Sequence, residues 1–204
     1  MTLSDWWFDR LINTFLGSQN LVPDVCMYVS PSQVIEQVRI SNLPSKTSDV
    51  IRIVVVSDTH GRHDKITLPG GDLFIHCGDV LMTSRLFSHE NTEKKLRKFN
   101  DWLADVPCTE KVVIAGNHDD CLERIGKIEA SKLLYNAVYL ENDYYQYKNL
   151  SIFGSPYSSG NSSNKAFQLS KTKSEFEAVL PRKVDVLLTH GRCPEIRNRF
   201  PHRY

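Results

Sequence analysis

Four short apolar runs divide this chain, and each of them ends in a cluster of polar residues. The first run consists almost entirely of Val and Ile; the four cover residues 50–56, 72–76, 111–115 and 184–188. Such β-branched runs are typical of strands that are buried on both faces. Charged stretches with helical periodicity lie between the runs, over 88–105 and within 120–134. Strands that alternate with helices predict an α/β domain built on a central sheet.

The other segments predict smaller features. Short antiparallel strands, with a turn at Lys148-Asn149, are expected over 138–140, 144–148 and 150–153. We expect an irregular lead-in over 17–49, a loop over 154–163 and a short helix over 175–180. Residues 3–16 repeat apolar side chains at helical spacing. They predict an amphipathic helix that docks on the domain or contacts a partner or a membrane surface.

Size and composition exclude several classes of protein. The 204 residues, 41% of them apolar, suffice for one sizeable core. The 25 Lys and Arg nearly balance the 24 Asp and Glu, and no basic patch is interleaved with aromatic residues, so no nucleic-acid polymer is expected as a partner. No apolar run approaches the ~20 residues of a membrane span. Five cysteines without CxxC spacing, and no signal-peptide pattern, predict a soluble cytoplasmic protein.

Polar side chains follow four of the predicted strands directly. Ligands of open α/β sheets bind at the carboxyl ends of the strands, so we expect these side chains to converge on one site. Carboxylate and amide oxygens, combined with imidazole nitrogens, suit a pair of divalent metal ions that act on a phosphate ester. A histidine that is not a ligand can protonate the leaving alkoxide. The candidate residues are Asp58, His60, Asp79, Asn117, His118 and His190.

Each motif also has a structural alternative. A single His after a strand is usually a hydrogen-bonded loop residue, Gly-Asp is a common turn, and Asn-His-Asp can cap the next helix. The coincidence of four such motifs favours the metal site. Arg62 and His63 either contact the phosphate or lie beside it, and His76 is expected as a buried core histidine. Asp119 either orients His118 or caps the helix that follows.

The order of the motifs, D-x-H, G-D, G-N-H-D and T-H-G, resembles the calcineurin-like metallophosphoesterase superfamily over residues 50–191. F-N-D-W-L at 99–103 and I-x-G-S-P at 152–156 are similar to its metallophosphoesterase domain-containing (239-type) subgroup, which is related to class III cyclic nucleotide phosphodiesterases. The resemblance implies a sandwich of two packed mixed sheets flanked by helices. It also implies a metal-dependent phosphoesterase that most directly hydrolyses phosphodiesters, cyclic nucleotides among them, and a small phosphoester substrate.

The resemblance further implies which residues bind two divalent ions, such as Mn, Fe, Zn or Ni. Asp58 and His60 would bind the first ion, and Asp79 would bridge both. Asn117 and His190 would bind the second ion.

His118 would be the general acid of the reaction or stabilise the phosphate. Relatives normally continue past T-H-G to a G-H-x-H motif with further ligands, which this sequence lacks. We therefore expect a C-terminally incomplete form of a longer enzyme, with impaired activity and a weak second metal site. It would have a lead-in at 1–49, a phosphoesterase domain at 50–191 and a basic tail at 192–204. Two alternatives stay open: a protein phosphatase of the same superfamily, and a non-catalytic protein that binds metal or a partner.

Overall fold

The part of the chain that the computed structural model describes covers residues 24–82, 89–158, 166–168, 181 and 183–190. The expected helices over 3–16 and 175–180, and the tail at 192–204, lie outside these residues. None of the described helices is long and apolar enough to cross a bilayer.

The main sheet is parallel throughout. Its strands stand in sequence order: β3 (Ile53–Val56), β4 (Gly71–Cys77), β5 (Cys108–Ile114) and β6 (Val138–Tyr139). The connections contain the 3-10 turn η2 (His63–Lys65) and the helices α2 (His89–Asp105) and α3 (Asp120–Leu133). The sequence prediction of both helices and of β3, β4 and β5 is confirmed, with boundaries that shift by a few residues. The expectation that residues 138–140 form an antiparallel strand is wrong: β6 is parallel to β5, because α3 returns the chain along the sheet between them.

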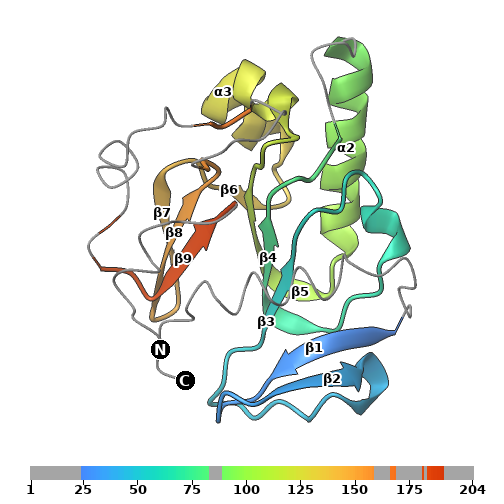
Figure 1. Cartoon of the computed structure of the whole chain (residues 1–204), viewed down its shortest axis with the longest axis vertical. Coiled ribbons are helices and arrows are strands. Elements are labelled where there is room, and N and C mark those ends of the chain that lie inside the picture. Colours follow the sequence, from blue (N-terminus) through green and yellow to red (C-terminus); the bar gives the residue numbers. More distant parts are fainter. Residues whose placement is uncertain (1–23, 83–88, 159–165, 169–180, 182, 191–204) are drawn as a thin grey trace.

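A second, mixed sheet packs against the first. It contains β7 (Asp143–Tyr147), β8 (Leu150–Ser155) and β9 (Val186–Thr189). β7 and β8 are antiparallel around the predicted turn, where Lys148 has a φ of 51°, whereas β8 and β9 are parallel. Figure 1 shows the β3–β6 sheet between α2 on one side and the β7–β9 sheet on the other. The fold is thus the expected α/β sandwich of two sheets with helices outside.

The two faces of β4 supply both halves of the core, because successive side chains of a strand point to opposite faces. Phe74 belongs to the cluster beneath the helices, together with Phe99 and Leu103 of α2. Leu73 and Ile75 belong to the cluster between the two sheets. All five side chains are at most 1% exposed, so β4 is the buried centre of the molecule.

Two expectations about the first part of the chain are wrong. Among the described strands β3 lies at an edge of its sheet, and Val55 is 36% exposed, so this run is not buried on both faces. Residues 17–49 are not irregular throughout, because β1 (Val25–Val29) and β2 (Ile35–Arg39) form an antiparallel hairpin, followed by the 3-10 turn η1 (Ile40–Asn42). Each hairpin strand has only five residues; β1 is a continuous apolar run, VCMYV, whereas β2, IEQVR, contains three polar residues.

Candidate metal centre

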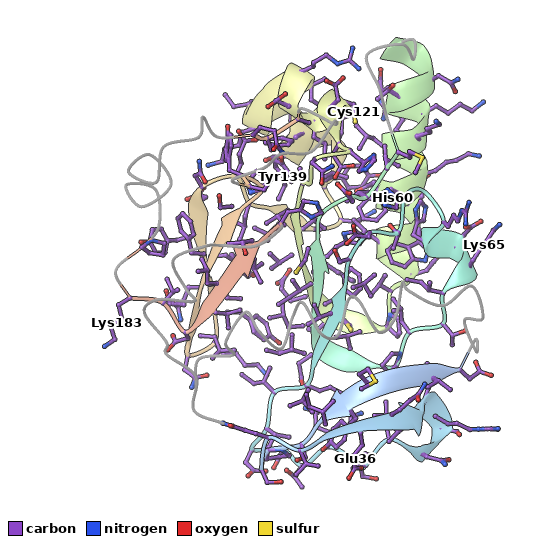
Figure 2. The ribbon with its side chains drawn as sticks, in the orientation of Figure 1. Glu36, His60, Lys65, Cys121, Tyr139 and Lys183 are labelled. Atoms are coloured by element: carbon purple, nitrogen blue, oxygen red, sulfur yellow. The ribbon has the colours of Figure 1, made fainter. Side chains whose placement is uncertain are left out.

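The loops that follow β3 and β4 are held together by their backbones. Three N–H groups of the first loop donate to three successive carbonyls of the second at 2.8–3.0 Å, in the pairs Asp58–Gly78, His60–Asp79 and Gly61–Val80. Asp58, His60 and Asp79 have positive φ angles of 55°, 48° and 51°, which are uncommon for residues other than Gly. Backbone strain of this kind clusters at functional sites. His60 lies at the upper end of the sheet in the view of Figure 2.

Asp79 is the centre of the cluster. Its carboxylate is almost completely buried, and Oδ1 accepts a hydrogen bond from the backbone N–H of His118 at 2.8 Å. Nε2 of His190 lies 3.3 Å from Oδ1, whereas Nε2 of His60 and Nε2 of His118 lie 3.8 and 3.9 Å from Oδ2. Burial favours the neutral acid, but the hydrogen bond and charge of His190 and the N–H of His118 outweigh it and hold the pKa of Asp79 below its ordinary value.

His190, at the end of β9, faces Asp79 with a defined ring nitrogen. Its Nδ1 lies 2.9 Å from the carbonyl oxygen of Cys77. Because a carbonyl oxygen can only accept a hydrogen bond, Nδ1 carries the hydrogen and donates it. Its Nε2 lies 2.9 Å from Oδ1 of Asn117. Burial disfavours a charged ring, yet the hydrogen bond and charge of Asp79 and the Cys77 carbonyl outweigh burial and raise the pKa of His190. The pocket therefore stabilises a positive charge, as a cation site must.

The side chains form two overlapping groups that fit divalent ions. One group is His60, Asp79 and His118, and the other is Asp58, Asp79 and His190; in each, the ligand atoms lie within 4.8 Å of one another. Asp79 belongs to both, as a bridging carboxylate would. Within the described residues, Nδ1 of His60 is buried without a hydrogen-bond partner. Mixed carboxylate and imidazole donors around an electron-rich, partly buried pocket suit divalent transition metals.

His118 lies among the candidate ligands rather than apart from them. Its ring stands edge-on to that of His60, with the centroids 4.8 Å apart. Its side chain is about 25% exposed, so one edge of the ring faces solvent. Both a metal ligand and a proton donor fit this position. The role of general acid therefore stays a prediction, as do the ligand roles of Asp58, His60, Asp79, Asn117 and His190.

Two glycines let the cluster pack this tightly. A Cβ on Gly78 would lie 2.6 Å from Nδ1 of His190, and one on Gly116 would lie 2.7 Å from Cε1 of the same ring and overlap Oδ1 of Asp79. Real Cβ atoms essentially never approach other atoms this closely. His190 leaves no room for a side chain at Gly78, the Gly of G-D, and Asp79 and His190 leave none at Gly116, the Gly of G-N-H-D. The sequence motifs alone do not show this reason for the two glycines.

The predicted substrate contacts differ in their surroundings. Arg62 is exposed on the loop after β3, and stays a prediction. His63 is buried, with its ring 5.1 Å from that of Phe99 and 5.2 Å from that of Trp102. Since its ring packs on α2, the structure does not support a phosphate contact by His63. His76 is fully buried, as expected of a core histidine.

Sequence reasoning left the role of Asp119 open, and did not single out Thr59. Asp119 takes the N-cap position of α3, but no hydrogen bond of its side chain caps that helix. Its carboxylate is fully buried and bonds backbone N–H groups instead. Burial raises the pKa of Asp119, as does the charge of Asp79, while these N–H groups lower it.

Thr59 Oγ1 lies 3.0 Å from Nε2 of His76 and 3.3 Å from the carbonyl of Val80. The only sequence signal for these two residues is that each is a polar residue inside a motif, Thr59 in D-x-H and Asp119 in G-N-H-D.

Known proteins share these motifs. The sequence profile of the calcineurin-like phosphoesterase family matches residues 51–200. Metallophosphoesterase domain-containing protein 1 of Homo sapiens is 32% identical over 169 residues, which cover 69% of this chain and 48% of the human protein. A UPF0046 protein of Caenorhabditis elegans is 26% identical over 208 residues, covering 92% of this chain and 68% of the worm protein.

A third relative is named for a different reaction, that of a lyase. The probable rhamnogalacturonate lyase C of Emericella nidulans is 36% identical over 160 residues, or 73% of this chain but only 14% of that protein. The present chain thus spans about half the length of the human relative and a small part of the fungal one. The family profile covers most of the residues between β3 and β9 that build the cluster. The chain belongs to the calcineurin-like phosphoesterase family, and within it to the metallophosphoesterase domain-containing subgroup.

Proposed function

We propose that this chain is a metal-dependent phosphoesterase that hydrolyses phosphodiesters, cyclic nucleotides among them, at the candidate metal centre. The observation that carries the proposal is the convergence of two carboxylates and three imidazoles at the carboxyl ends of the strands, with Asp79 shared by both groups. Membership of the family supports the reaction class. The substrate is a small phosphoester. We place the protein in the cytoplasm, in line with the four described cysteines, which form no disulfide.

The proposed assignment of ligands to the two ions is the one that the resemblance implies. The two groups support Asp79 as the shared residue but divide the others differently, with Asp58 beside His190 and His60 beside His118. Asp58 and His60 hold the first ion, Asp79 bridges, and Asn117 and His190 hold the second. When bound, two such ions lower the pKa of water and neutralise charge on the phosphoryl group. The Nδ1–H bond of His190 to a backbone carbonyl leaves Nε2 as its ligand atom, the usual arrangement of metal-binding histidines. We propose Mn²⁺ as a suitable ion.

His118 is proposed to donate a proton to the leaving alkoxide. Its backbone N–H is bound to Asp79, and Nε2 of its ring lies 3.9 Å from Oδ2 of the same carboxylate. Its exposed edge can meet a substrate oxygen from the solvent side. Arg62, on the neighbouring exposed loop, is proposed to contact the phosphate.

Hydrolysis of bis-p-nitrophenyl phosphate with and without Mn²⁺ tests the function. We expect activity that Mn²⁺ supports and that EDTA abolishes. His118→Ala should lower turnover by about 10²–10⁴-fold, the usual range for general acid–base groups, and leave the metal content near that of the parent. A phosphodiester with an alkoxide leaving group should show a larger defect, because p-nitrophenolate needs less protonation.

Metal analysis of the same variant separates the two roles of His118. A variant that has lost its metal together with its activity would identify His118 as a ligand and contradict the proposed acid. Absence of any Mn²⁺-supported hydrolysis by the parent, with phosphodiesters and phosphomonoesters alike, would refute the proposed function.

A further inference from the structure

Asp119 lies directly behind the metal centre and has no contact with solvent. Its carboxylate accepts three backbone hydrogen bonds. Oδ2 accepts from Val80 at 3.0 Å and from Gly116 at 2.9 Å, and Oδ1 accepts from Leu81 at 2.8 Å. The distances are those of well-formed hydrogen bonds, and a carboxylate acceptor makes each of them stronger than a neutral acceptor would.

The three N–H groups belong to two different loops of the site. Val80 and Leu81 follow Asp79 directly in the loop after β4, and Gly116 precedes Asn117 and His118 in the loop after β5. One rigid planar group therefore binds both loops at once. It connects the chain next to the bridging carboxylate with the chain that carries Asn117 and His118.

The backbone of Asp119 serves other bonds, so its side chain is not needed for the local turn or the helix. Its N–H donates to the carbonyl of Gly116 at 3.0 Å, and its own carbonyl accepts from Leu122 at 2.9 Å at the start of α3. These bonds form the turn and begin the helix without the carboxylate. The carboxylate adds one further bond within the turn, from the N–H of Gly116, and the link to Val80 and Leu81, which lie 39 and 38 positions earlier in the chain.

We propose that Asp119 is a positioning residue, whose carboxylate sets the distance between Asp79 and the Asn117–His118 segment. The proposal rests on the proposed function only for its consequence in catalysis, since the spacing is a property of the metal-free chain. Asp119 does not contact the groups that would react. It acts through the backbone of the residues that carry them, and the hydrogen bond from the His118 N–H to Oδ1 of Asp79 reports the spacing.

Amide hydrogen exchange of the metal-free chain tests the proposal on Asp119→Asn. The amide group replaces one carboxylate oxygen by NH₂, which cannot accept a hydrogen bond, so at least one of the three N–H groups loses its acceptor. We expect the His118 amide, which Asp119 itself does not bind, to exchange about tenfold faster or more. Amides of the β7–β8 ladder should keep their rates. A uniform acceleration of all amides would mean a general loss of stability and would contradict a positioning role.

Two control variants isolate the effect. Asp120→Asn removes a neighbouring carboxylate that pairs with Arg124 at 2.8 Å, and so matches the loss of charge at the start of α3. Asp185→Asn removes a carboxylate that accepts the N–H of Ser151 at 2.8 Å in the second sheet, and so matches the loss of a backbone contact. Neither should change the exchange of the His118 amide.

Metal binding gives the second measurement. Residues that hydrogen-bond metal ligands typically change affinity by about 10–100-fold when mutated. Asp119 acts one step further away, through the backbone beside the proposed ligands, so we expect Asp119→Asn to bind Mn²⁺ about tenfold more weakly. The visible spectrum of the Co²⁺-loaded variant should differ from that of the parent, because the ligands around the ion are displaced. Asp120→Asn should match the parent in both.

The outcomes separate this inference from the proposed function. A folded Asp119→Asn variant with parental His118 exchange and parental Mn²⁺ affinity would overturn the positioning role, even if the parent is an active phosphoesterase. If the parent hydrolyses nothing but Asp119→Asn still accelerates exchange of the His118 amide, the positioning role is supported and the proposed function is refuted. If Asp119→Asn does not fold, Asp119→Glu decides. It keeps the charged acceptor but lengthens the link, so selective acceleration at His118 supports the proposal and parental exchange overturns it.

Discussion

At the scale of single residues, Asp79 has neighbours packed against it so closely that small changes reach it directly. One glycine, three imidazoles and a backbone N–H surround the carboxylate. A native interior has no spare room for an added methyl group, and the surrounding atoms must move instead. The chemistry of the site is therefore sensitive to substitutions that carry no charge and contact no ligand.

Gly116→Ala tests this sensitivity. The added Cβ overlaps Oδ1 of Asp79, so we expect the carboxylate to be displaced and Mn²⁺ affinity to fall by about tenfold or more. Overpacking should also lower the free energy of unfolding by about 1–3 kcal/mol. Gly70→Ala is the matched control, because its Cβ would lie 3.6 Å from the nearest heavy atom outside its neighbours. Isothermal titration and urea unfolding measure both effects. Parental Mn²⁺ affinity in Gly116→Ala would show that the site accommodates the added methyl group, and would contradict this sensitivity.

His76 predicts a dependence of stability on pH. Burial lowers the pKa of His76 from 6.5 to about 3 in the folded chain, with smaller effects from neighbouring charges. The unfolded chain takes up this proton below about pH 6.5, whereas the folded chain does not until about pH 3. The stability that neutral His76 contributes is therefore complete above about pH 6.5 and is lost as the pH falls from there toward about 3.

Urea unfolding at about pH 7.5 and about pH 5 tests this linkage on His76→Gln, whose amide can still reach Thr59. Between these pH values the parent should lose about 2 kcal/mol more stability than the variant, since each unit of pKa shift is worth about 1.4 kcal/mol. Comparing the variant with the parent cancels the titration of the other histidines and carboxyl groups. Identical pH dependence in both proteins would mean that His76 takes up its proton in the folded chain over the same pH range as in the unfolded chain.

At the scale of elements, α2 shows how a sequence pattern becomes packing. Its apolar residues Leu96, Phe99 and Leu103 are at most 1% exposed, and the ring of Phe99 contacts those of His63, His76 and Trp102. Its outer face carries the exposed ion pair of Glu93 and Arg97 at 2.6 Å. The helix is thus held by one face, as its 3.6-residue periodicity predicts.

Two substitutions on α2 test this asymmetry. Phe99→Ala should lower the free energy of unfolding by about 3–5 kcal/mol, because it leaves a cavity under the helix. Arg97→Ala, two residues away on the solvent face, should cost no more than about 0.5 kcal/mol, since exposed ion pairs contribute little. Chemical denaturation measures both. A loss at Arg97 comparable to that at Phe99 would contradict the assignment of the buried face.

The elements also show what the sequence could predict and what it could not. Apolar runs and helical periodicity located β4, β5, α2 and α3, because burial on both faces or on one stripe leaves a local pattern. The edge position of β3 depends on which strands pair, a property of the whole sheet that no local window contains. The β1–β2 hairpin was missed although β1 is a continuous apolar run, VCMYV, because the prolines and serines around it favoured an irregular segment, and its partner strand IEQVR is largely polar.

At the scale of the whole molecule, the site was predictable in composition but not in geometry. The motifs named Asp58, His60, Asp79, Asn117, His118 and His190, and the structure brings all six into one region at the carboxyl ends of the strands. His63 follows the first motif equally closely, yet its ring turns toward α2. The contact of Asp119 with the loop after β4 depends on residues 38 and 39 positions away, so spacing within a motif could not reveal it.

The central claim is that Asp79 holds two metal ions together, and the number of Mn²⁺ ions bound per chain tests it most directly. We expect about two ions in the parent, by elemental analysis after dialysis. Asp79→Ala should lose most of both. Asp72→Ala is the matched control, because Asp72 lies near the opposite end of β4 and pairs with Lys46 at 2.9 Å, so it should bind like the parent. Equal Mn²⁺ content in Asp79→Ala and the parent would contradict the account.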